Sequence, residues 1–337
     1  MAYQAKAHSE AMRTNVLEEQ HPRRFGEPDP ESWVDGVGPD DPTVARWRHD
    51  WQRGVTVASE AGDDRLANRR RDYGSYLFTL IDWVLGVVLQ VLFSIPLLIG
   101  AIAIYAANGH TIVGPGGASA LNAFVKSLAY NPAFNLIGII AVDGALLLVL
   151  WFRLTRVRRG WDIFGLGAQL RQGAGRAVLI GIGVGVMAIV AATLVGYLQQ
   201  VTGLDKILAH VGGDPEAQQK QLIDPLRTAP AWVVAGTVLA GTFVAPAVEE
   251  LFFRGYIFRA FAIRKGLPIA YGLSAFTFAF THLLPAQFLP LFVVGLLLCF
   301  AYQCSGSLLG DFTAHAFNNG FAFAVALIEI YHVHLFG

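Results

Sequence analysis

The chain has 337 residues, of which 54% are hydrophobic and only 15% are charged, with a mean hydropathy of +0.47. This composition excludes an ordinary soluble globular enzyme, in which roughly a quarter of the residues are charged. The 25 basic and 25 acidic residues give a net charge of zero, but this value averages two unlike regions. We expect no nucleic-acid partner.

The first region is a polar tail. Residues 1–75 hold 14 of the 25 acidic residues and 11 of the 25 basic ones, and the stretches 21–30 and 36–42 are rich in Pro, Gly and acidic residues. Such segments bury too little apolar surface to offset the conformational entropy lost on folding. We therefore predict a disordered tail over 1–75 and a transmembrane domain over 76–337.

The second region contains apolar runs of the length that crosses a bilayer, which is roughly 20 residues for a helix. These runs predict an all-α polytopic membrane protein with about eight spans, at 78–105, 132–152, 177–197, 229–253, 268–284, 285–302, 308–323 and 324–336. Three glycines in the third span, Gly181, Gly183 and Gly185, predict that another helix packs closely against it.

Basic residues predict the orientation in the membrane. They cluster before the first span, between the second and third spans, and after the fourth. The intervening loops 106–131 and 198–228 together carry four basic residues. The positive-inside rule therefore places the N-terminus and the arginine-rich segments in the cytoplasm.

Two adjacent carboxylates, Glu249 and Glu250, interrupt the apolar fourth span. An ionised carboxylate at membrane depth costs several kcal/mol unless it has a partner, so it marks a candidate functional site. Arg254 lies four residues after Glu250, a spacing that puts both on one helix face. We expect these two to form an ion pair, which leaves Glu249 as the unpaired acid.

Other polar groups in the transmembrane domain occur at helical spacing. Phe278 and His282 are four residues apart, and so are His315 and Asn319. A single histidine in an apolar helix is usually a hydrogen-bonded structural residue. Two histidines, an asparagine and an unpaired glutamate can instead activate a water molecule and stabilise an oxyanion.

The motifs around these residues resemble a known family. Glu249-Glu250-Leu-Phe-Phe-Arg254 is similar to the EExxxR motif of the CPBP family, the CAAX proteases and bacteriocin-processing membrane proteins. Phe278-Ala-Phe-Thr-His282 is similar to its FxxxH motif, and His315-Ala-Phe-Asn-Asn319 to its HxxxN motif. The resemblance covers about 150–330, with the motifs in the family's order.

The resemblance implies a helical core with a site in a cavity open to the cytoplasmic leaflet. It also implies a role for each residue: Glu249 is the general base, His282 assists it, His315 and Asn319 line the oxyanion side, and Glu250, Arg254 and Phe278 support the site. The reaction is then hydrolysis of a peptide bond, beside the lipid bilayer, in a membrane-associated or lipidated peptide or protein. The arginine- and glycine-rich composition favours a bacterial plasma membrane.

Alternatives remain at this stage. Glu249, His282 and His315 form a possible ligand set for a divalent metal, although the HExxH spacing of zinc proteases is absent and we expect no cofactor. Asp143 and Asp311 suggest an aspartyl protease, but the GxGD pattern is incomplete, and we expect Asp311 to cap its helix. A transporter is a weaker possibility. The main alternative is a catalytically idle scaffold or bacteriocin-immunity protein of the same fold.

Overall fold

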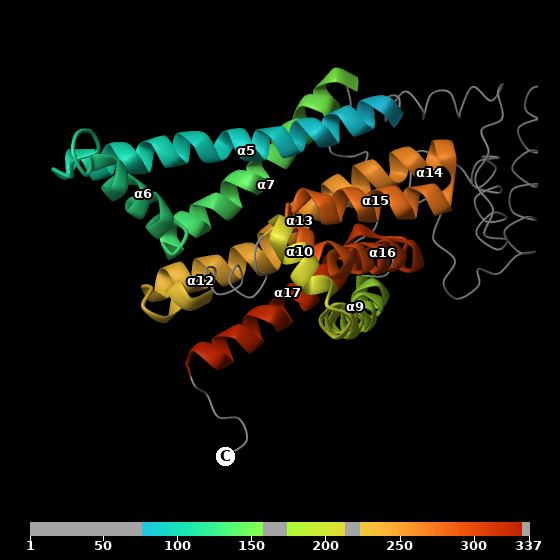
Figure 1. The fold of residues 1–337 in the computed structure, drawn as a ribbon. Coiled ribbons are helices and arrows are strands. Elements are labelled where there is room, and N and C mark those ends of the chain that lie inside the picture. Colours follow the sequence, from blue (N-terminus) through green and yellow to red (C-terminus); the bar gives the residue numbers. More distant parts are fainter. Residues whose placement is uncertain (1–75, 158–173, 213–222, 332–337) are drawn as a thin grey trace, which may run out of the picture.

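The computed structural model describes residues 76–157, 174–212 and 223–331 (Figure 1). The predicted tail 1–75 lies outside the described residues, as do Arg158, Arg159 and Arg171, which belong to the basic cluster between the second and third predicted spans. Every regular element in the described part is a helix, as the all-α prediction requires. In chain order, the longer helices are α5 (Tyr76–Ala107), α6 (Gly117–Leu128), α7 (Pro132–Val157), α9 (Ala174–Thr202), α10 (Leu204–Gly212), α12 (Ala231–Leu239), α15 (Leu267–Thr281), α16 (Phe288–Ser305) and α17 (Leu308–Ile330).

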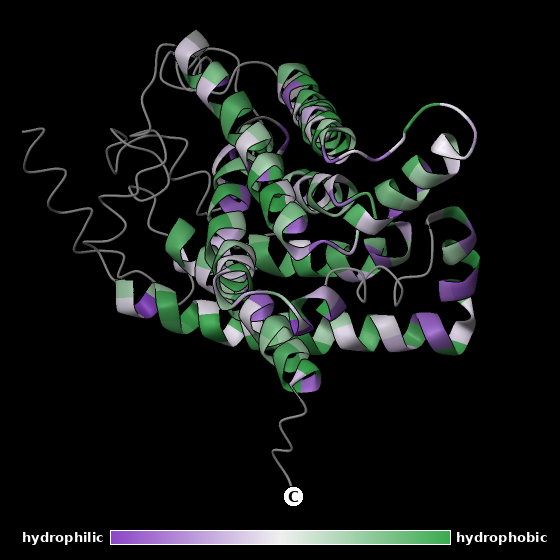
Figure 2. Cartoon of the chain, turned by 90° about the vertical axis from the view of Figure 1, so that its left-hand side faces the viewer, coloured by the Kyte–Doolittle hydropathy of each residue, from purple (hydrophilic) through white to green (hydrophobic). Residues whose placement is uncertain are grey.

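Five helical stretches of the described residues are long and apolar enough to cross a membrane. They are Leu77–Ala107, Pro132–Thr155, Ala174–Thr202, Ala231–Ala262 and Pro285–Ser305, with α15 as a shorter apolar helix. Hydrophobic residues make up most of the helices (Figure 2). Large apolar side chains are exposed along α5. Such a surface is stable in contact with lipid rather than water, and the chain is an integral membrane protein.

The predicted spans divide the C-terminal end of the chain too often. The sequence predicts separate helices at 308–323 and 324–336, but Leu308–Ile330 is the single helix α17. Gly320 is not a break in this helix. A Cβ at that position would lie 3.3 Å from the Thr242 side chain, so the glycine permits a close helix contact instead.

The fourth predicted span runs as one helical segment from Ala231 to Lys265, in which the backbone pattern changes four times. Two π-helical stretches, η3 (Ala240–Val244) and η4 (Leu251–Phe258), flank the short α-helix α13 (Ala245–Glu250), and α14 (Arg259–Lys265) follows. π-helical turns are rare and occur frequently at functional sites. Here they bracket the turn that carries Glu249 and Glu250.

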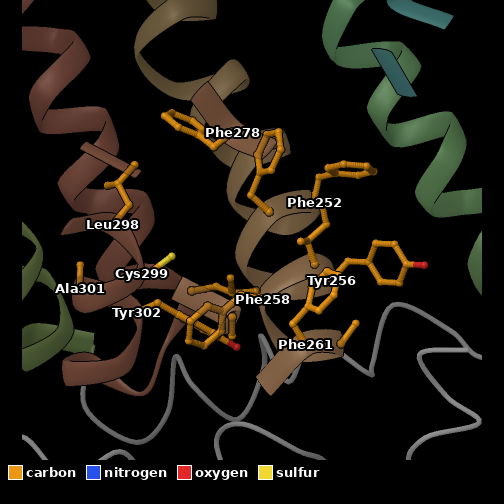
Figure 3. Packing of buried hydrophobic residues seen from close by; sticks show 14 of the residues in the cluster. Phe252, Tyr256, Phe258, Phe261, Phe278, Leu298, Cys299, Ala301 and Tyr302 are labelled. Carbon is orange, nitrogen blue, oxygen red and sulfur yellow. The ribbon is translucent and has the colours of Figure 1, made fainter. Parts of the chain in front are cut away.

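Aromatic side chains form the core beneath this segment. Phe252, Phe253 and Phe258 of η4 are almost fully buried and belong to one cluster with Phe278 of α15 and Tyr302 of α16. Figure 3 shows Phe252, Phe258, Phe278 and Tyr302 in this cluster. The Phe253 and Phe278 rings meet edge to face, with centroids 5.4 Å apart. This packing fixes η4 against α15 and α16. Cys299 is a free cysteine that is buried in the same core.

Glycines allow α9 and α17 to pack closely. This confirms the predicted close packing at two of the three glycines. A Cβ on Gly181 would lie 2.5 Å from the carbonyl oxygen of Gly310, and one on Gly185 would lie 3.0 Å from that of Ala314. Gly183 differs, because nothing lies within 4 Å of its Cβ position. The helical period places Gly183 on the exposed side of α9.

A buried polar cluster joins α5 to α7 and η4. The Asp82 carboxylate accepts hydrogen bonds from Arg153 Nε at 2.6 Å and from the Tyr256 hydroxyl at 2.5 Å. Arg153 Nη2 also lies 2.5 Å from the same oxygen. Since buried charges are stable only when paired and hydrogen-bonded, this cluster ties the first two spans to the segment that carries the glutamates.

Candidate active site

Glu250 and Arg254 form the ion pair expected from their spacing, and both are almost fully buried. Arg254 Nη1 donates to Glu250 Oε1 at 3.0 Å, and Nη2 donates to the carbonyl of Gly295 on α16 at 3.0 Å. The guanidinium also lies 4.7 Å from the centroid of the Phe278 ring. Arg254 therefore connects η4 to both α15 and α16.

Glu250 has a second partner that the sequence interpretation did not include. His315 Nδ1 lies 2.7 Å from Glu250 Oε1, although the two residues are 65 positions apart. Because a carboxylate is only an acceptor, Nδ1 carries the proton in this contact. Glu250 is thus more than the ion-pair partner of Arg254, since it also sets the orientation of the His315 ring.

His315 lies between the two glutamates. Its Nε2 is 3.8 Å from Glu249 Oε2, which is beyond hydrogen-bonding distance but within that of an ion pair. The Glu249 side chain is 16% exposed, whereas that of Glu250 is 2% exposed. Glu249 is therefore the more accessible carboxylate, and its Oε2 atom is buried without a hydrogen-bond partner in the described residues.

Phe278 contacts both imidazoles. Its ring centroid lies 4.9 Å from that of His282 and 5.5 Å from that of His315, both edge to face. His282 is half-buried at the C-terminal end of α15, where its Nδ1 lies 2.8 Å from the carbonyl oxygen of Phe278. That carbonyl accepts a hydrogen bond from Nδ1–H, which leaves Nε2 as the unprotonated nitrogen of a neutral ring.

Asn319 lies one turn beyond His315 on α17. Its Nδ2 donates to the carbonyl of Gly241 in η3 at 2.9 Å, and its Oδ1 accepts from Asn318 at 3.2 Å. The contact with Gly241 links the HxxxN motif to the π-helical turn before Glu249. One N–H of the Asn319 amide remains for a ligand.

Two aspartates also surround the glutamates, and the sequence interpretation assigned them elsewhere. Asp143 of α7 is 3% exposed and within electrostatic range of Glu249. Asp311 of α17 is fully buried and within electrostatic range of Glu250 and Arg254. Each is an acidic residue in an otherwise apolar helix, and this signal could have marked both as candidate functional residues.

The expectation that Asp311 caps α17 is wrong. The N-cap of that helix is Ser307, whose hydroxyl accepts from the backbone N–H of Leu309 at 3.0 Å. Asp311 lies in the first turn, with neither carboxyl oxygen hydrogen-bonded in the described residues. Its side chain lies instead within electrostatic range of Glu250 and Arg254.

A bound metal ion requires several ligand atoms that converge on one position. Among the described residues, no group of three or more His, Cys, Asp and Glu side chains has the arrangement of a metal site. Glu249 and His315 are neighbours, but the possible set of Glu249, His282 and His315 does not converge as ligands.

Comparison with known proteins gives a match over the part of the chain that carries the three motifs. Residues 230–321 match the family model described as type II CAAX prenyl endopeptidase Rce1-like. No curated protein and no solved structure matches the chain. The matched range is less than a third of the chain. It includes all of the motif residues Glu249, Glu250, Arg254, His282, His315 and Asn319. The resemblance to the CPBP family is therefore confirmed over residues 230–321, where the chain is similar to the Rce1-like type II CAAX prenyl endopeptidases.

Proposed function

We propose that this protein is an intramembrane endopeptidase of the CAAX-protease-like type, which hydrolyses a peptide bond with a water molecule activated by Glu249. The observation that carries the proposal is the asymmetry of the two glutamates. Glu250 is committed to Arg254 and His315, whereas Glu249 is partly exposed and makes no hydrogen bond in the described residues. A general base needs such an accessible carboxylate beside groups that stabilise charge.

The reaction follows from the chemistry of the residues around Glu249. Glu249 accepts a proton from water while the water oxygen forms a bond to the carbonyl carbon of the substrate. His282 supports this step, because its Nε2 can accept a hydrogen bond from the same water. The product of the step is a tetrahedral intermediate with a negative charge on the former carbonyl oxygen.

His315 and Asn319 are suited to stabilise that charge. When His315 is doubly protonated, Nδ1–H donates to Glu250 and Nε2–H points toward Glu249 and the oxyanion. The remaining N–H of Asn319 supplies a second donor. Glu249 then gives its proton to the amide nitrogen as the C–N bond breaks, which releases an amine and a carboxylic acid. The acid then loses its remaining proton to water or to the amine.

The test compares cleaved membrane peptides in cells that express the wild type or Glu249→Gln. A general base contributes about 10²–10⁴-fold to the rate, so the substitution is expected to abolish the products that are specific to the wild type. Full biological activity of Glu249→Gln would reject the protease proposal and favour the scaffold or immunity protein. Purified protein tested with the identified peptide then separates direct cleavage from an indirect effect.

A further inference from the structure

Asp311 is a buried acid that the reaction above leaves without a role. It lies on α17 four residues before His315 and is fully buried. In the described part of the chain, neither of its carboxyl oxygens accepts a hydrogen bond. Because buried polar groups almost always have a hydrogen-bond partner, this side chain needs a specific explanation.

The helical period gives the face of α17 on which Asp311 lies. Residues four apart share a helix face, so Asp311 lies on the face from which His315 reaches Glu250 Oε1 at 2.7 Å. Thr313 and Phe317 lie on another face, where their side chains lie against glycines of α9. Asp311 therefore faces the EExxxR motif, and its carboxyl group is within hydrogen-bonding reach of the Glu250 carboxyl group.

The position of one proton decides whether these two acids attract or repel each other. Carboxylate oxygens only accept hydrogen bonds, so two ionised groups in contact form no bond and their charges repel. Glu250 is the ionised partner, because its Oε1 accepts from both Arg254 and His315. Asp311 has no such donor among the described residues, and an ionised carboxylate in that position is unfavourable. The proton is therefore expected on Asp311.

This proton supplies a partner for unpaired oxygens of both residues. Glu250 Oε2 is buried and has no hydrogen-bond partner within the described ranges. The O–H group of a neutral Asp311 supplies that partner, and Glu250 stays ionised beside Arg254, the cation in electrostatic range of both acids. An apolar environment can keep a carboxylic acid neutral at neutral pH, so that it donates a hydrogen bond.

We propose that Asp311 is a neutral carboxylic acid that donates a hydrogen bond to Glu250 Oε2 and thereby positions His315. Its bond holds the second oxygen of Glu250, while Arg254 and His315 hold the first. The carboxylate cannot rotate away from His315 Nδ1, and Nε2 stays on the side of Glu249, 3.8 Å from Glu249 Oε2. Asp311 is a positioning residue, because it touches neither the substrate nor the attacking water. The proposal rests on the protease function above and adds a residue to its site.

Infrared spectroscopy tests the protonation state without any need for turnover. The purified full-length protein is measured at neutral pH in a detergent without ester groups, where a protonated carboxyl group absorbs above the amide bands and a carboxylate does not. Asp311→Asn is expected to remove one carboxylic-acid band. The control Asp224→Asn changes a half-exposed aspartate of η2 (Asp224–Arg227) and is expected to remove none. A wild-type spectrum without an acid band, or one that Asp311→Asn leaves unchanged, would overturn the proposal.

Two variants distinguish a hydrogen-bond donor from a charge. Asp311→Asn keeps the shape of the side chain and an N–H group that can donate to Glu250 Oε2, whereas Asp311→Leu has a similar size and no donor. We expect kcat per folded molecule to stay within about threefold of the wild type in Asp311→Asn and to fall about tenfold or more in Asp311→Leu. KM is expected to be unchanged in both variants, because Asp311 does not touch the substrate. An essential charge would instead lower kcat equally in both variants, and a dispensable side chain in neither; either result contradicts the proposal.

The His315 ring reports its own positioning. Nitrogen NMR of histidine-labelled protein distinguishes the Nδ1–H form from the Nε2–H form, and the signals that His315→Gln removes are those of this ring. The Nδ1–H form is expected in the wild type and in Asp311→Asn, and a mixture of the two forms in Asp311→Leu. A variant that is only less stable would keep the Nδ1–H form, so the same form in all three proteins would rule out a positioning role.

The outcomes separate this proposal from the proposed function. An acid band from Asp311 and a change of the His315 ring in Asp311→Leu, in a protein whose wild type cleaves no peptide, would leave the bond to Glu250 standing and reject the protease. Cleavage by a wild type in which Asp311 is ionised would do the opposite.

Discussion

His315 Nδ1 and Glu250 Oε1 are 2.7 Å apart, and this contact joins the EExxxR motif on α13 and η4 to the HxxxN motif on α17. The same oxygen accepts a hydrogen bond from Arg254 Nη1 at 3.0 Å. One buried carboxylate therefore positions a guanidinium and an imidazole together. The neighbouring Glu249 shares the same environment but is free of both bonds.

This arrangement predicts opposite effects for the two glutamates. Glu250→Gln leaves the buried Arg254 without its counter-charge, and breaking such a pair costs about 3–5 kcal/mol of unfolding free energy. Glu249→Gln breaks no hydrogen bond and is expected to cost less than about 1 kcal/mol while it abolishes cleavage. Unfolding of both variants in detergent, measured beside peptide cleavage, checks the difference. Equal losses of stability would show that the two roles are not separate.

Phe278 is predicted to support catalysis through the rings and the cation that it contacts. Phe278→Leu removes the edge-to-face contacts with His282 and His315 and the cation–π contact with Arg254, each of which contributes about 0.5–2 kcal/mol. We expect a lower kcat together with lower stability. Phe276→Leu, on the exposed side of the same helix, is the control and is expected to leave kcat unchanged. Equal kcat values in the two variants would contradict a role of the Phe278 ring.

The packing of α9 on α17 makes a second matched comparison possible. Gly181→Ala places a methyl group 2.5 Å from the Gly310 carbonyl, and overpacking of this kind typically costs about 1–3 kcal/mol. Gly183→Ala meets no atom and is expected to be neutral or to stabilise the helix by up to about 1 kcal/mol. Thermal unfolding of the two purified variants gives the comparison. A stable Gly181→Ala protein would show that the two helices separate more easily than their contact distance suggests.

The Asp82 cluster is predicted to contribute to stability and not to the chemistry. Asp82→Asn leaves Arg153 without its carboxylate, whereas Tyr256→Phe removes one hydrogen bond to that group. We expect the first change to cost about 3–5 kcal/mol and the second about 1–3 kcal/mol. Cleavage per folded molecule should be unchanged in both variants. A selective loss of kcat in Tyr256→Phe would instead indicate that the cluster positions η4 for catalysis.

Local spacing in the sequence predicted the local part of the site and little of the rest. The Glu250–Arg254 pair follows from i,i+4 geometry, and the Ser307 cap could have been found from a serine directly before an apolar helix. The contact of Glu250 with His315 depends on how α17 packs against α13, which no short motif encodes. The π-helical turns around Glu249 have no sequence signature either, because they arise from tertiary packing. The same limit explains why Asp143 was not placed beside Glu249.

Chelation tests the expectation that no metal cofactor takes part in the reaction. The purified wild type is incubated with a strong chelator, its metal content is measured, and its cleavage of the identified peptide is compared before and after. We expect full activity, because Glu249 and the two imidazoles supply proton transfer and charge stabilisation by themselves. Loss of activity that Zn²⁺ restores would instead favour a metal held by Glu249, His282 and His315. His282→Ala distinguishes the two mechanisms further, since a ligand of that kind would lower the bound metal, whereas a residue that assists the base would lower only kcat.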